Sequence, residues 1–219
     1  MKPIKQLIQS DFKTLSAIFI AMVFSVFTLM LRMKLNKSFF YLFLVWNAFL
    51  ALIPYAITMY LKTVRLKKWQ LGLSFAVWLL FLPNAPYIIT DFLHLRVSNT
   101  SFLWLDILVL LSFALSGLLL FYLSLNDMKA IVNEHFPKIS QSLFIATLLL
   151  LSSFGVFLGR FIRFNSWDVL SQPQLITNTV WDIITKPQLH SEAWLFTLAF
   201  GGFLYIGLFI INKFNKSLN

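Results

Sequence analysis

Residues 102–125 read FLWLDILVLLSFALSGLLLFYLSL, an apolar run that contains a single charged residue, Asp106. A helix needs about 20 residues to cross a hydrocarbon core of about 30 Å, so this run is long enough to span a membrane. Five more apolar runs predict spans over residues 14–31, 38–61, 69–90, 140–162 and 192–212. The sequence therefore predicts an all-α fold, a polytopic transmembrane helix bundle of about six spans.

The composition excludes a water-soluble globule. Of 219 residues, 59% are hydrophobic and 12% are charged, whereas soluble domains carry about 25% charged residues. A disordered chain is excluded as well, because disorder needs low hydrophobicity and high net charge. The absence of cysteine rules out disulfides and cysteine-ligated metals. No domain boundary or repeat is evident, and we interpret residues 1–219 as a single integral membrane domain.

The distribution of positive charge predicts the orientation. The net charge of +10 is interpreted as a membrane feature, because lysine and arginine hold cytoplasmic loops against anionic lipid; no nucleic-acid partner is expected. When the six spans alternate in direction, eleven lysines and arginines fall on one side of the membrane and seven on the other. The positive-inside rule then predicts that the N- and C-termini are both cytoplasmic.

The third span is expected to break at Pro83 and Pro86, because proline lacks an N–H and crowds the carbonyl four residues earlier. Asn84 is expected to cap a new short helix there. On that helix, spacings of three, four and three residues predict one polar stripe at the extracytoplasmic end of the span, formed by Asn84, Tyr87, Asp91 and His94.

Other polar residues are predicted to reach the same depth. Charge inside an apolar span is costly and normally has a partner, and Asp106 and Arg160 are both placed near the extracytoplasmic ends of their spans. Further polar residues fall in the same region, namely Asn47, Arg163, Asn165 and Asp168. Two simpler interpretations stay open: Asp106 pairs with an arginine for purely structural reasons, and Asp91 and His94 are merely solvated at a helix end.

The loop before the last span contains an apolar face at helical spacing within residues 174–185. Its members are Leu175, Ile176, Val180, Trp181, Ile183 and Ile184. Such a segment is expected either to lie flat in the extracytoplasmic membrane interface or to pack on the bundle as an ordinary loop helix.

Three blocks together resemble a known family. They read WNAFLALIP at residues 46–54, PNAPYIITDFLHL at 83–95 and GRFIRFNSWD at 159–168. In this order they resemble domain of unknown function 1361, a bacterial family of multi-pass membrane proteins. The resemblance implies a protein of the bacterial cell membrane and carries over no activity.

Three functions are compatible with these patterns. In the first, an enzyme acts on a lipid or lipid-linked anionic substrate: Asp91, His94 and Asp106 are catalytic, and Arg160 and Arg163 clamp a phosphate. The remaining substrate-binding candidates are Asn47, Asn84, Tyr87, Asn165 and Asp168.

A variant of this enzyme uses Asp91, His94 and Asp106 as metal ligands, with Asp168 as a further carboxylate; aspartate three residues before histidine on one helix face permits this. The second function is a transport component that captures a small-molecule ligand, docking a partner through Ala17 and Ala21. The third is a structural or assembly protein. The sequence leaves the metal content, cofactors, protein partners and enzymatic activity unknown.

Overall fold

The computed structural model describes residues 9–64, 66–97 and 102–217. These residues are mostly helical and contain no strand, which confirms the all-α prediction. The chain divides into two compact units, Met1–Pro137 and Lys138–Asn219.

Six helices are long and apolar enough to cross a membrane, as predicted. They are Phe12–Asn36, Phe40–Leu61, Lys68–Arg96, Leu103–His135, Gln141–Ile162 and Ser191–Lys213. Each overlaps one predicted span, so the protein is a multi-pass membrane protein.

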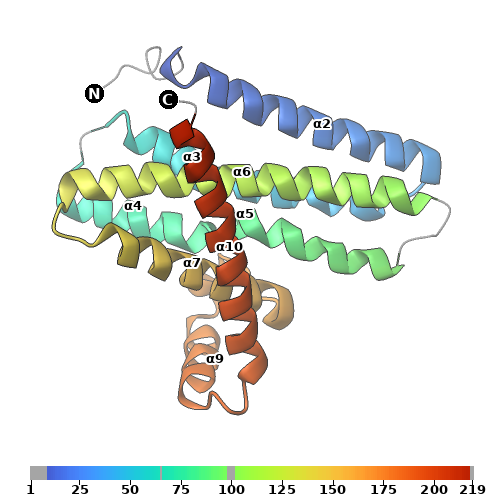
Figure 1. The fold of residues 1–219 in the computed structure, drawn as a ribbon. Helices are drawn as coiled ribbons and strands as arrows, with labels where there is room; N and C mark the ends of the chain where they lie inside the picture. The colour runs from blue at the N-terminus through green and yellow to red at the C-terminus, as the bar shows by residue number, and fades with distance from the viewer. Residues whose placement is uncertain (1–8, 65, 98–101, 218–219) are drawn as a thin grey trace. The chain divides into compact units, whose positions relative to one another are not determined.

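The first unit is organised around one long central helix. Its described elements are α2 (Phe12–Asn36), η1 (Phe40–Leu42), α3 (Phe43–Leu61), α4 (Lys68–Phe81), α5 (Asn84–Tyr87), η2 (Ile88–Val97) and α6 (Leu103–His135). Helix α6 packs against α2, α3, α5 and η2, and α3 also packs against α4. In Figure 1, α2 (blue) lies alongside α6 (lime to yellow).

The first span is longer than predicted. The expected end was residue 31, but α2 continues through Arg32 to Asn36, where Lys37 takes a left-handed backbone conformation. Hydropathy places an arginine outside a span because an unpaired charge is costly in lipid. In the structure Arg32 is buried, so the helix continues past it.

The helix does change at Pro83 and Pro86, and two carbonyls at the break, those of Phe81 and Leu82, accept hydrogen bonds from other donors. The N–H of Ala85 turns back to the carbonyl of Leu82 at 3.3 Å, which leaves the carbonyl of Phe81 open. The side-chain Nδ2 of Asn84 donates to that carbonyl at 3.0 Å. The predicted capping role of Asn84 is therefore wrong. Pro83 is the cap residue, and the Asn84 amide bonds to a carbonyl of the preceding turn.

A glycine permits the close approach of α5 to α6. A Cβ added to Gly117 would overlap the carbonyl oxygen of Ala85 and crowd the side chain of Ile88. The short proline-containing turn therefore lies directly against the α6 backbone.

The second unit contains α7 (Gln141–Phe157), the π-helical turn η4 (Leu158–Ile162), α8 (Asp168–Ser171), α9 (Pro173–Thr185) and α10 (Ser191–Ser217). Helices α7 and α10 pack against each other. Gly201 of α10 faces Leu150 and Ser153 of α7, and a Cβ there would lie 3.1 Å from the Leu150 side chain.

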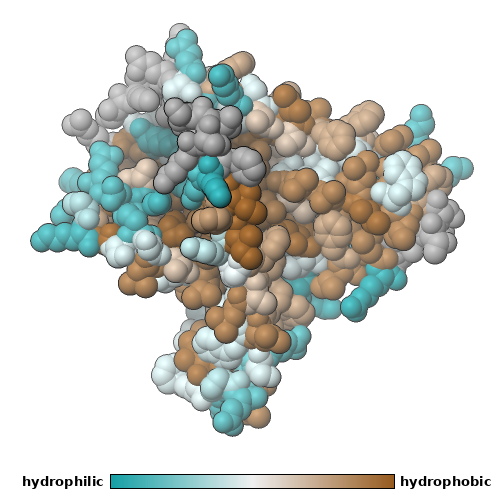
Figure 2. Space-filling view, in the orientation of Figure 1, coloured by the Kyte–Doolittle hydropathy of each residue, from teal (hydrophilic) through white to brown (hydrophobic). Residues whose placement is uncertain are grey.

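The surface agrees with a membrane environment. Many large apolar side chains are exposed, including Phe19, Phe27 and Met30 on α2. On the face drawn in Figure 2, brown apolar residues cover the flanks of the first unit's helices, and hydrophilic residues gather toward the helix ends. Lipid rather than water suits these flanks.

Candidate functional site

Five side chains form a polar layer at one end of the first unit: Arg32, Asn47, Asp91, His94 and Asp106. They come from the end of α2, the first turns of α3, the turn η2 and the start of α6. Because these helices alternate in direction, these chain positions meet at the same end of the bundle. We refer to these five residues as the polar layer.

A buried ion pair joins α2 to α6 within the polar layer. The Nε of Arg32 donates to Oδ1 of Asp106 at 2.8 Å, and both side chains are almost fully buried. Arg32 also donates from Nη1 to the carbonyl of Ser38 at 3.1 Å, and its guanidinium lies 4.6 Å from the centre of the Tyr41 ring. Oδ2 of Asp106 is buried, with no hydrogen-bond partner among the described residues.

This pair identifies the arginine that contacts Asp106. Asp106 does pair with an arginine, as the structural interpretation proposed, and that arginine is Arg32. The sequence placed Arg32 in a loop beyond the first span, so it was missed as a partner. The pair takes up one oxygen of the Asp106 carboxylate, which the enzyme hypothesis had used as an acid or an orienting group.

Asp91 is the second buried carboxylate of the polar layer, with 1% of its surface exposed. Its Oδ2 accepts a hydrogen bond from Nδ2 of Asn47 at 2.9 Å. Its Oδ1 lies 3.9 Å from Nε2 of His94, which is about one-third exposed. The structure thus brings together three of the predicted residues, Asn47, Asp91 and His94, and shows that Asp91 is not a solvated side chain at a helix end.

Aromatic rings connect the two halves of the polar layer. The His94 ring lies 4.9 Å from the Phe43 ring and 5.9 Å from the Phe40 ring. Phe40 in turn contacts Tyr41, whose ring lies beside Arg32. The imidazole therefore lies against two aromatic rings and near one carboxylate.

Of the four residues in the predicted polar stripe, Asp91 and His94 lie together, whereas Asn84 and Tyr87 make other contacts. Asp91 and His94 share a face because η2 is a 3₁₀ helix, in which residues three apart eclipse. Asn84 instead bonds to Phe81. The carbonyl of Tyr87 accepts a hydrogen bond from the Thr90 hydroxyl at 2.6 Å.

The other predicted residues, Arg160, Arg163, Asn165 and Asp168, lie in the second unit. Arg160 belongs to η4, and Arg163 follows it in a left-handed conformation with φ of 69°. Asp168 is buried and holds its own loop: Oδ2 accepts from the backbone N–H of Asn165 at 2.7 Å, and Oδ1 accepts from the Ser171 hydroxyl at 3.2 Å. That these residues converge with the polar layer stays a prediction.

The described residues contain no group of three histidine, aspartate or glutamate side chains that could hold a metal ion. The metal variant required Asp91, His94 and Asp106 to act together. It finds no support in this geometry.

Comparison with known proteins identifies the family of the chain. The family model described as "Protein of unknown function (DUF1361)" matches residues 46–206, which is most of the chain. The chain belongs to this family. No curated protein and no solved structure matches it.

The DUF1361 match covers four of the five residues of the polar layer. Asn47, Asp91, His94 and Asp106 lie inside the matched residues, whereas Arg32 precedes them. The arginine that neutralises Asp106 is thus supplied by a helix outside the matched region.

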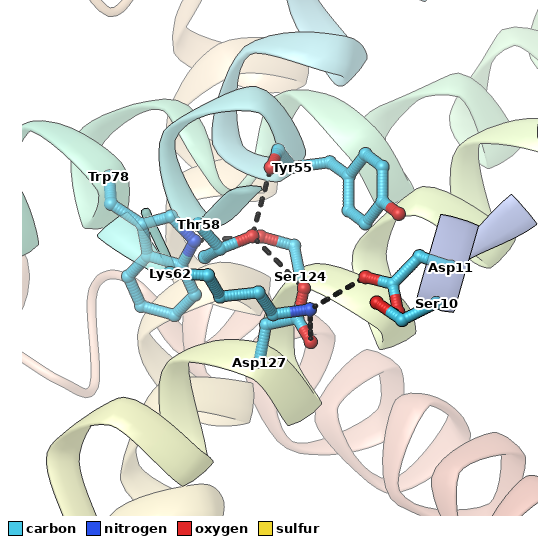
Figure 3. A network of polar contacts seen from close by, with 8 residues as sticks. All are labelled: Ser10, Asp11, Tyr55, Thr58, Lys62, Trp78, Ser124 and Asp127. Carbon is cyan, nitrogen blue, oxygen red and sulfur yellow. Dashed lines mark hydrogen bonds and ion pairs between the residues drawn. The ribbon is translucent and has the colours of Figure 1, made fainter. Parts of the chain in front are cut away.

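A second ionic cluster lies at the opposite end of the first unit and was not predicted. Figure 3 shows Nζ of Lys62 between the carboxylates of Asp11 and Asp127, bonded to Asp127 and 3.5 Å from Asp11 Oδ2. The Thr58 hydroxyl also contacts Asp127 at 3.5 Å. At 1.5 Å per residue, α6 rises about 32 Å between Asp106 and Asp127, close to the thickness of a hydrocarbon core.

Between these clusters, hydroxyl groups join α2 to α6. Ser25 contacts Ser116 at 3.2 Å and Thr28 contacts Ser112 at 3.3 Å, and all four are buried. With Arg32, the α2 members follow a spacing of three and four residues, which places them on one helix face. That spacing was the available sequence signal for this polar interface.

Proposed function

We propose that this membrane protein acts on a lipid or lipid-linked anionic substrate at the extracytoplasmic membrane boundary. His94 accepts a proton from the substrate, and Asp91 positions and stabilises the imidazolium that forms. One observation carries the proposal: a buried carboxylate, bonded to Asn47, faces a partly exposed histidine. A carboxylate beside an imidazole favours its charged form and fixes its orientation.

The distance between the two groups is compatible with this role. At 3.9 Å the Asp91–His94 contact is an ion-pair distance rather than a hydrogen bond. Catalytic hydrogen bonds are often long in a ligand-free protein and shorten in the substrate complex. Asp106 serves in this proposal to hold Arg32 rather than as an acid.

In the proposal, Arg160 and Arg163 bind the anionic group, because guanidinium matches phosphate in a bidentate geometry. This part rests on the sequence. Arg163 offers a clean test because glycine favours its backbone conformation: Arg163→Gly removes the guanidinium without straining the chain. Lys37 has the same kind of conformation, with φ of 48°, so Lys37→Gly is a matched control.

Native mass spectrometry of the purified protein with added phosphatidylglycerol or polyprenyl phosphate tests binding and turnover together. We expect a bound anionic lipid that is lost in Arg163→Gly and retained in Lys37→Gly. Conversion of the bound lipid to a species of different mass should disappear in His94→Gln and Asp91→Asn while binding persists. Absence of any bound anionic lipid in the unmodified protein would refute the proposal.

A structural role is the second candidate, and the buried Arg32–Asp106 pair favours it. In that case Asp91→Asn and Arg163→Lys lower the thermal stability of the protein. Under the enzyme proposal, the same variants lose activity and remain folded.

The proposed orientation places both termini in the cytoplasm. Since the chain has no cysteine, a single introduced thiol reports the side of the membrane. A membrane-impermeant maleimide applied to intact cells should label Gln188→Cys and leave Lys138→Cys unlabelled. The reverse pattern would invert the orientation.

A further inference from the structure

The two aspartates of the loop that joins η4 to α10 are hydrogen-bonded or ion-paired within the loop. Asp168 bonds to Asn165 and Ser171. Asp182 contacts Lys186 at 2.6 Å and His190 at 2.8 Å. The carboxylates of this loop are therefore engaged locally.

The same loop exposes several large apolar side chains, although it lies outside the membrane-spanning helices. Leu170 is 85% exposed, Leu189 76% and Trp181 67%. Leu175 and Ile184 are about half exposed. Single exposed apolar residues are ordinary on a protein surface, but a concentration of them marks an interaction site.

Helix α9 carries an apolar arc that is wider than the stripe covered by protein. Ile183 is buried against Phe157 and Ala193, and its backbone carbonyl accepts a hydrogen bond from the Trp194 indole at 3.2 Å. At about 100° per residue, Leu175 and Ile184 lie on opposite flanks of the buried stripe, with Trp181 beyond Ile184. Packing within the unit therefore covers only the centre of the arc.

We propose that this loop surface, formed by Leu170, Leu175, Trp181, Ile184 and Leu189, rests in the headgroup and acyl boundary of the bilayer. The loop connects the ends of two spans, Gln141–Ile162 and Ser191–Lys213, so it begins and ends at one membrane surface. Its exposed apolar side chains continue onto α10, where Leu195 and Leu198 are exposed within a span. Tryptophan is typical of this boundary, and carboxylates that are already bonded within the loop cost less to bring near lipid.

The centre of α9 packs on its unit through Ile183, as the second sequence interpretation expects. In the proposed arrangement the flanks of the helix contact lipid, as the first interpretation expects. Residues 170 and 189, outside the predicted segment, extend the surface.

Spin-label accessibility in proteoliposomes of phosphatidylethanolamine and phosphatidylglycerol tests this surface. The cysteine-free chain allows one label at a time, at Leu170→Cys, Trp181→Cys and Ile184→Cys. The control is Asn178→Cys, an exposed position on the polar side of α9. We expect the ratio of collisions with oxygen to collisions with a nickel chelate to be several-fold higher at the three apolar positions.

Two results would overturn the inference. Equal nickel accessibility at residues 170, 181 and 178 would place the surface in water. Protection of residue 181 from both reagents would indicate a protein partner, such as a second copy of the chain. Leu170 is the most exposed of these residues, so its replacement disturbs little packing. The accessibility of a label at residue 170 therefore tests the proposal even where Trp181→Cys folds poorly.

Discussion

Arg32 and Asp106 lie 74 positions apart in the chain, yet the guanidinium Nε and the carboxylate Oδ1 are 2.8 Å apart and shielded from solvent. The pair ties α2 to the helix that organises the first unit. Removing one member leaves the other as a buried, uncompensated charge, which costs far more than the intact pair contributes.

Arg32→Met should therefore lower the free energy of unfolding by about 3–5 kcal/mol. The double variant Arg32→Met with Asp106→Leu should recover most of this loss, because two apolar side chains need no compensation. Equilibrium unfolding in mixed micelles measures both. A double variant as unstable as the single one would show that the site depends on its polar contacts.

Gly117→Ala should destabilise the first unit by about 1–3 kcal/mol, the usual cost of overpacking, because the new Cβ overlaps the Ala85 carbonyl. Gly72→Ala is the matched control: it also lies in a helix, and nothing lies within 4 Å of an added Cβ. Replacing glycine by alanine in a helix favours stability by up to about 1 kcal/mol. The two variants should therefore shift the melting temperature in opposite directions, and equal shifts would contradict the close contact between α5 and α6.

Much of the fold was predictable, because hydropathy reports directly on what lipid tolerates. The ends of the spans were less so. Arg32 and Asp127 lie within helices that a hydropathy pattern ends earlier, since their partners, Asp106 and Lys62, come from distant positions. Nothing in a single sequence specifies such a pairing. Asn84 shows a different limit: its residue type predicts a helix cap, but its side-chain amide bonds to the Phe81 carbonyl, which the Ala85 N–H does not reach.

Asn47→Leu should cost about 1.5–3 kcal/mol, the range for a hydrogen bond to a charged group, because Asp91 loses a donor in a buried setting. Asn178→Leu, on an exposed face of α9, should change stability by less than about 0.5 kcal/mol. Thermal unfolding in detergent compares the two. If both variants change the stability equally little, the Asn47–Asp91 hydrogen bond does not contribute to the stability. Asp91 would then be held in position by other contacts.

Lowering the pH should weaken the contacts of Asp182 at the C-terminal end of α9. Hydrogen bonds from Lys186 and His190 lower the pKa of Asp182 below its usual value. A lowered folded-state pKa means that the favourable contribution is present at neutral pH and is lost as the pH falls through that pKa. Carbon NMR of labelled aspartate should show Asp182 titrating below about 3.9 and moving upward in Lys186→Ala. An unchanged titration in that variant would exclude Lys186 as the main cause.

The hydroxyl contacts between α2 and α6 should contribute far less than the ion pair beside them. Side-chain hydrogen bonds within membranes average about 0.6 kcal/mol, and each hydroxyl here also has a backbone carbonyl within reach, as Thr28 has that of Ser25 at 2.9 Å. Thr28→Val keeps the shape of the side chain and should cost less than about 1 kcal/mol, against several for Arg32→Met in the same unfolding assay. A loss as large as that of the arginine variant would mean that the α2–α6 interface is held by its hydroxyl groups and not by its charge.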